Sequence, residues 1–135
     1  MISLETFIER LCRLGADRGP RGFPRKVQDR EILVKSLIML LDSDRLYSEN
    51  EINAAILAWN RDVAPAIDTD HVSVRRLLVD HGHLERTLDG RAYRVGFPSR
   101  PAAFDLEVED VDVRATVAAY LQQHPRRAKR ASADA

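Results

Sequence analysis

The sequence predicts a mainly α-helical fold that includes one small β-hairpin. Three consecutive segments carry apolar residues at helical spacing, and a short hairpin motif follows the third of them directly. In a winged helix-turn-helix, the second and third helices form the helix-turn-helix and a hairpin packs beside them. Because further amphipathic segments flank this core, we expect a winged helix-turn-helix with an extra N-terminal and an extra C-terminal helix.

The first predicted helix runs from about Ser3 to Leu14. Ser3 is a good N-cap, and apolar residues recur at helical spacing after it. Residues 19–24 cannot extend this helix, because they hold two prolines, which lack the amide donor, and two glycines, which are entropically costly. We therefore expect an N-terminal helix and linker over 1–22 and a compact winged-helix domain over 23–97.

The three helices of the predicted domain have distinct signals. Residues 27–41 are so broadly apolar that most of this helix should be buried, which makes it the central helix. The next helix begins at a capping box, Ser48 to Glu51, and should end near Asn60. The third fits Asp70 to His81, with a glycine after its end.

A hairpin and a C-terminal helix complete the prediction. Asp-Gly at 89–90 lies between the runs 84–88 and 91–95, which is a strong signal for a two-residue hairpin turn. Residues 98–124 form an acidic segment and a helix that begins at about residue 112. We expect residues 125–135 to be a disordered basic tail.

Composition limits the classes of protein that the chain can belong to. With 135 residues, 44% hydrophobic and 31% charged, it fits one domain of globular type. The single cysteine, Cys12, excludes an internal disulfide and suits a reducing compartment. The sequence shows neither a signal peptide nor a stretch that could span a membrane. We therefore expect a cytoplasmic bacterial protein with no membrane partner.

The sequence favours binding over catalysis. It has no Gly-x-Ser-x-Gly elbow, no glycine-rich phosphate loop and no His-Glu-x-x-His helix. His81 and His83 are two ligands, and a stable zinc site needs three or four. We expect Cys12 to be a structural thiol and not a nucleophile. We expect no enzyme activity, no catalytic residue, no metal and no cofactor.

Four motifs resemble those of a prokaryotic family called domain of unknown function 2087, and the resemblance covers roughly residues 23–95. They are Phe23-Pro24-Arg25-Lys26, Tyr47 to Asn53, Val74 to Asp80, and Asp89-Gly90-Arg91-Ala92-Tyr93. Members of that family occur alone or attached behind helix-turn-helix transcription regulators. The resemblance therefore implies a winged-helix-like fold linked to transcription. The connection over 60–68 is longer than the family pattern predicts.

Double-stranded DNA is the first partner to consider. The net charge is zero, so contact with phosphates must come from local basic clusters. The third predicted helix would enter a major groove while other cations meet phosphates. The candidate residues are Arg25, Lys26, His71, Ser73, Arg75, Arg76 and Arg91. Alternatively, Arg75 and Arg76 pair with nearby carboxylates such as Asp80 or Glu85.

The two terminal helices suggest a second kind of partner. Their apolar stripes must pack on the domain, on each other or on a second subunit. The residues of these stripes are Leu4, Phe7, Leu11, Val113, Val117, Tyr120 and Leu121. A homodimer would present two recognition helices to DNA half-sites. The alternative function is a protein–protein interaction module that docks on a larger assembly without contacting DNA.

Overall fold

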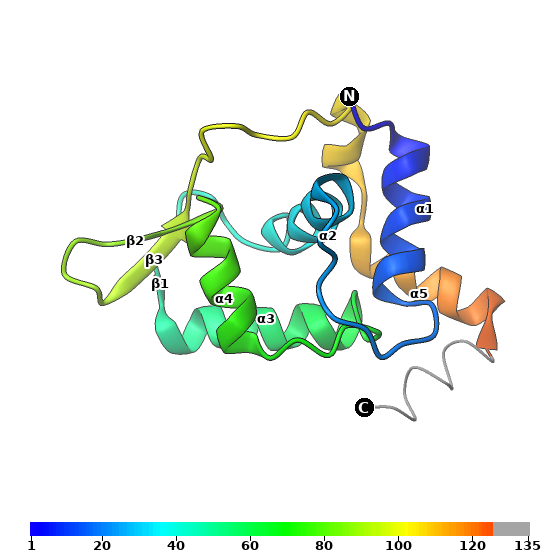
Figure 1. The fold of residues 1–135 in the computed structure, drawn as a ribbon, viewed down its shortest axis with the longest axis horizontal. Helices are drawn as coiled ribbons and strands as arrows, with labels where there is room; N and C mark the ends of the chain where they lie inside the picture. The colour runs from blue at the N-terminus through cyan, green and yellow to red at the C-terminus, as the bar shows by residue number, and fades with distance from the viewer. Residues whose placement is uncertain (126–135) are drawn as a thin grey trace.

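The computed structural model of the protein describes residues 1–125, and Figure 1 shows the arrangement of its elements. Within this range the chain is mainly helical, as predicted. The helices are α1 (Leu4–Gly15), α2 (Val27–Ile38), α3 (Glu49–Asp62), α4 (His71–Asp80), the 3₁₀ helix η1 (Leu106–Asp110) and α5 (Val113–Gln123). None of the helices described here has both the length and the apolar composition that crossing a membrane requires. The predicted tail lies outside the described residues beyond position 125.

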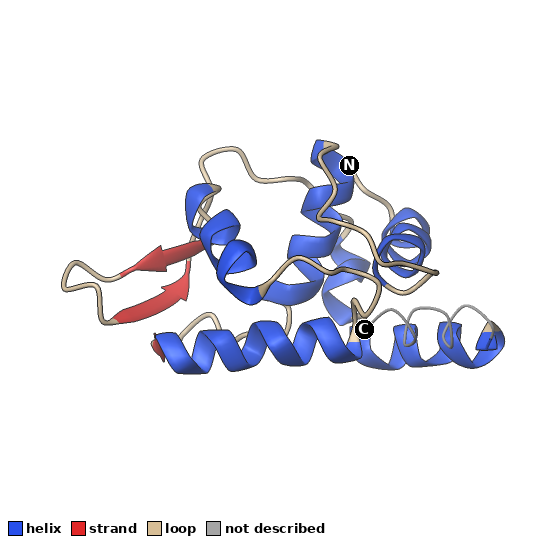
Figure 2. Ribbon diagram, turned by 60° about the horizontal axis from the view of Figure 1, so that its bottom comes forward, coloured by secondary structure: helices blue, strands red, loops and turns tan. Residues whose placement is uncertain are grey.

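The predicted hairpin is present and belongs to a three-stranded antiparallel sheet. Strand β2 (Leu84–Arg86) pairs with β3 (Ala92–Val95), and β1 (Tyr47–Ser48) pairs with the other side of β3. The sequence analysis did not predict β1, because two residues are too few to show alternation. From α2 to β3 the order of elements is that of a winged helix-turn-helix, and the hairpin extends from one end of the helical body (Figure 2).

The central helix α2 ends at Ile38, three residues earlier than predicted. Beyond it, the amides of Leu40 and Leu41 bond to carbonyls three residues back, which tightens the chain into a turn. Trp59 of α3 is buried against α2, where its Nε1–H donates to the Ser36 hydroxyl at 2.9 Å. This bond satisfies the polar atom of the indole inside the core.

The helices α1 and α5 contribute to the same hydrophobic core as the elements from α2 to β3. Phe7, Leu11 and Val117 are fully buried, Val113 is nearly so, and α1 contacts both α2 and α5. The residues partly buried against this core include Leu4, Tyr120 and Leu121. Of the alternatives stated above, packing within the chain is the one observed. The dimer contact predicted for Phe7, Leu11, Val113 and Val117 stays a prediction, and in the structure these four side chains are covered within one chain.

The long connection between α3 and α4 is well anchored. Asn60 Nδ2 donates to the carbonyl oxygens of Ala64 at 2.8 Å and Ile67 at 2.9 Å, and both of these residues are buried. The linker after α1 runs alongside, with Arg21 in a parallel bridge to Ile67. These contacts fix the point from which α4 starts.

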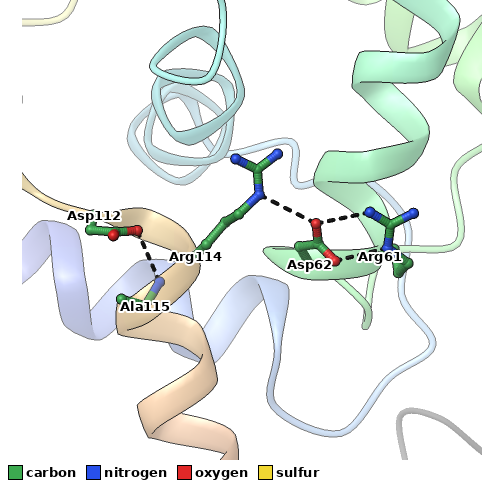
Figure 3. Close-up of polar contacts among 5 residues, drawn as sticks. All are labelled: Arg61, Asp62, Asp112, Arg114 and Ala115. Carbon is green, nitrogen blue, oxygen red and sulfur yellow. Dashed lines mark hydrogen bonds and ion pairs between the residues drawn. The ribbon is translucent and has the colours of Figure 1, made fainter.

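A polar cluster joins the end of α3 to the start of α5 (Figure 3). Asp62 accepts from Arg61 at 2.8 Å and from Arg114 Nε at 3.3 Å. These bonds, that from Arg61 foremost, hold the pKa of Asp62 below its usual value. Asp112 caps α5 by accepting from the Ala115 amide at 3.0 Å.

Removing the cap of α5 tests how much this helix contributes to stability. Asp112→Ala is expected to lower the free energy of unfolding by about 1 kcal/mol, the usual cost of losing an N-cap side chain. The measurement is equilibrium denaturation in urea. Asp110→Ala is the control, because Asp110 is exposed and makes no side-chain hydrogen bond within residues 1–125. Equal losses in both variants would contradict the capping role.

Candidate nucleic-acid interface

Helix α4 presents one face to the core and one to solvent. Asp70 caps it by accepting from the Ser73 amide at 2.7 Å, and Val74 and Leu78 are buried. Ser73 and Arg76 lie on the opposite, exposed side. Helix α4 stands where the sequence predicted the recognition helix, so this exposed face is the one to compare with the predicted DNA contacts.

Arg75 is engaged inside the protein. Its guanidinium donates to Asn53 Oδ1, lies 3.6 Å from the Glu49 carboxylate and sits 6.0 Å from the centre of the Tyr93 ring. Only 17% of the side chain is exposed. Arg75 therefore ties α4 to α3 and the sheet, and the carboxylate that it pairs with is not one of those considered from sequence. Of the two arginines predicted on α4, Arg76 is the one whose side chain is exposed.

A cleft separates α4 from the hairpin, with arginines on both walls. Its volume is about 210 Å³, and its lining includes Val72 and Arg76 from α4 and Arg86 from β2. Neither Arg76 nor Arg86 pairs with a carboxylate in the part of the chain that the structure describes. Sequence reasoning missed Arg86, although its place at the end of the strand before the Asp-Gly turn was a usable signal.

The predicted cations Arg25 and Lys26 lie in the segment that leads from the start of α4 into α2. Both are exposed, and Lys26 is the residue before α2. The Phe23 amide donates to Thr69 Oγ1 at 3.1 Å, beside the residues that lead into α4, whereas Val27 lines a cavity with Asp80 at the other end of that helix. His71, the first residue of α4, is half-buried. The two cations therefore lie on a segment that runs along α4 and not at its N-terminal end.

The turn of the hairpin holds its own acidic group. Asp89 Oδ1 accepts from the Thr87 hydroxyl at 2.6 Å and from the Arg91 amide at 3.0 Å, and Gly90 adopts a φ of 73°. These bonds, that from Thr87 foremost, keep the pKa of Asp89 below its usual value. Leu88 and Arg91 are exposed at the tip. The turn thus directs Leu88 and Arg91 outward, whereas the Asp89 carboxylate forms its hydrogen bonds within the turn.

His83 lies just beyond the other end of α4, largely buried beside Glu31. Its Nε2 is 3.1 Å from Glu31 Oε2, and the two side chains are 12% and 11% exposed. Burial lowers the pKa of His83 below its usual value of 6.5, and this effect outweighs the attraction of Glu31. The neutral ring is therefore the form that the fold favours.

The lowered pKa of His83 predicts how stability depends on pH. The unfolded chain binds the His83 proton more readily than the folded chain, so the free energy of unfolding should fall as pH drops through 6.5 toward the folded pKa. The measurement is urea denaturation at a series of pH values between about 5.5 and 7.5. His83→Gln should flatten this part of the curve. An unchanged slope in that variant would contradict the assignment.

Cys12 is a buried thiol of α1, a helix that lies apart from α4 (Figure 1). Burial raises its pKa to about 11, so the reactive thiolate is scarce at neutral pH. We expect a disulfide reagent at pH 8 to modify Cys12 only on unfolding, with no fast phase in the native protein. The absorbance of the released thiol measures this, and rapid native labelling would show that α1 opens easily.

The structure defines a mainly helical domain with a small three-stranded antiparallel sheet. A family model described as an uncharacterized protein conserved in bacteria, domain of unknown function 2087, matches residues 21–95. Since this is more than half of the chain, the protein belongs to that family. The resemblance inferred from sequence is thereby confirmed. No curated protein and no solved structure matches the chain.

Proposed function

We propose that the protein binds double-stranded DNA in the manner of winged-helix transcription regulators. The observation that carries the proposal is the group of arginines around the exposed face of α4 that have no carboxylate partner within residues 1–125: Arg76, Arg86 and Arg91. A cation without a protein partner can pair with a phosphate and release the counterions bound there. The binding therefore does not require a positive net charge.

The parts of this surface have different roles in the proposed complex. Ser73 on α4 faces the edges of bases in the major groove, and Arg76 on the same face meets a phosphate at the edge of that groove. Arg86 and Arg91 on the hairpin contact the flanking backbone, and Arg25 and Lys26 meet phosphates from the segment that leads into α2. The domain acts by contact alone, without catalysis or a cofactor.

A protein partner is the second candidate. Leu88 at the hairpin tip is fully exposed and Val72 on α4 is 43% exposed, so the α4 face offers apolar groups as well as cations. Such groups are typical of surfaces that dock on another protein. Docking through this face would depend on Leu88 and only weakly on salt.

The test of DNA binding is fluorescence anisotropy with a random duplex at several salt concentrations. Each phosphate contact contributes about −0.9 to the slope of log affinity against log salt, so Arg76→Ala and Arg86→Ala should each weaken binding and make the slope about 1 shallower. Arg114→Ala on α5 is the control, because α5 lies at the opposite end of the molecule from the hairpin (Figure 1). No binding at low salt would refute the proposal.

A further inference from the structure

Tyr93 is a buried residue on the middle strand of the small sheet. It pairs with Tyr47 of β1 on one side and with Arg86 of β2 on the other, and only 3% of it is exposed. Its hydroxyl donates to Glu49 Oε1 at 3.5 Å, at the first residue of α3. The Arg75 guanidinium of α4 lies 6.0 Å from the centre of its ring. The ring therefore has a fixed place relative to both helices.

The Arg86 side chain contacts both this ring and the hairpin turn. Its guanidinium lies 5.7 Å from the centre of the Tyr93 ring, which is within the range of a cation–π contact. Its Nε–H donates to the Gly90 carbonyl at 3.1 Å. A long exposed side chain without such contacts samples many rotamers, whereas these two contacts restrict where the guanidinium lies.

The rest of the Arg86 guanidinium remains available to a ligand. Arginine has five N–H donors, and the Gly90 carbonyl accepts from one of them. Within residues 1–125 the two Nη groups of Arg86 make no hydrogen bond. Arg86 lines the cleft between the hairpin and α4 together with Arg76, and the arginines of this lining outnumber its one carboxylate, Asp80. A guanidinium that is already held in place loses less freedom when it binds a phosphate, so more of the interaction energy appears as affinity.

We propose that Tyr93 is a positioning residue of the DNA interface, whose ring holds the Arg86 guanidinium at the cleft where it contacts a phosphate. This inference rests on the DNA binding proposed above, and the buried Tyr93 does not itself touch DNA. Arg91 at the tip of the same hairpin provides the contrast, because its side chain is exposed and makes no hydrogen bond among the described residues. A phosphate contact of Arg91 should therefore not depend on Tyr93.

The test is a pair of double-mutant cycles, read from the salt dependence of binding to the random duplex. In the otherwise unmodified protein, Arg86→Ala and Arg91→Ala should each make the slope about 1 shallower. Tyr93→Leu should also make it about 1 shallower, because Arg86 then no longer lies at the phosphate. In the Tyr93→Leu protein, Arg86→Ala should change the slope no further, whereas Arg91→Ala should still have its full effect.

Tyr93→Phe is the conservative variant, and it should keep the slope of the unmodified protein because it retains the ring. A slope as shallow as that of Tyr93→Leu would assign the effect to the hydroxyl and overturn the proposal. A full effect of Arg86→Ala in the Tyr93→Leu protein would overturn this inference and leave DNA binding intact. No binding by the unmodified protein at low salt would instead refute the DNA proposal on which the inference rests.

Two further observations separate positioning from folding. Loss of the effects of both Arg86→Ala and Arg91→Ala in the Tyr93→Leu protein would show that Tyr93 maintains the whole hairpin, which would overturn the proposal. If Tyr93→Leu does not fold, NMR of the unmodified protein decides. Nuclear Overhauser effects between the Arg86 Nε proton and the Tyr93 ring protons should be present in the free protein and persist when the duplex is added. Their absence, or their loss on binding, would contradict the positioning role.

Discussion

Leu11→Asp is expected to unfold the protein, with a loss of more than about 4 kcal/mol in the free energy of unfolding. Leu11 is 0% exposed and packs in the core between α1 and its neighbours. Truncating a buried leucine alone costs about 2–5 kcal/mol, and a buried carboxylate without a partner adds to this. Circular dichroism and urea denaturation measure the effect.

Leu106→Asp is the matched control for this prediction. Leu106 is 87% exposed in η1, so its replacement should change the free energy of unfolding by less than about 0.5 kcal/mol. Sedimentation of both variants distinguishes a core role from an interface role. A Leu11→Asp protein that stays folded but changes its oligomeric state would restore the interpretation of α1 as a subunit contact.

Arg75→Ala is expected to lower the free energy of unfolding by about 2 kcal/mol. The loss comes from the hydrogen bond to Asn53 and the contact with the Tyr93 ring, which are shielded from solvent. The pair with Glu49 adds little, because 52% of the Glu49 side chain is exposed. Thermal and urea denaturation both report this loss.

Arg76→Ala is the control, because it is expected to affect DNA binding and to leave stability nearly unchanged. Arg76 is exposed and pairs with no carboxylate within residues 1–125, so its removal should change the free energy of unfolding by less than about 0.5 kcal/mol. It should make the salt dependence of DNA binding shallower, whereas Arg75→Ala should leave that slope unchanged. A shallower slope for Arg75→Ala would show that Arg75 meets phosphate after all.

Local signals explain the elements that the sequence predicted well. The capping box forms as expected, with Ser48 accepting from the Glu51 amide and Glu51 accepting from the Ser48 amide. The Asp89-Gly90 turn closes the hairpin, and the helix predicted over 70–81 is observed over His71–Asp80. In each case the atoms that determine the structure lie within a few residues of one another, so the pattern is visible in the sequence.

Features that depend on distant contacts could not be predicted. Arg75 meets Asn53 from 22 positions along the chain, and an arginine gives no local sign of where its partner lies. The apolar stripe of α1 was visible, but an apolar stripe indicates only that something covers it. The same limit applies to Glu31 and His83, which only the tertiary fold brings together.

The first residues of the chain are joined to the segment just before η1. The Ile2 amide donates to the Ala103 carbonyl at 2.8 Å, and the Asp105 amide donates to the Ile2 carbonyl at 2.9 Å. These bonds hold the N-terminus in place, and it lies away from the hairpin (Figure 1). A purification tag or fluorescent reporter placed upstream of Met1 would therefore leave the arginine-bearing groove open for titration with oligonucleotides.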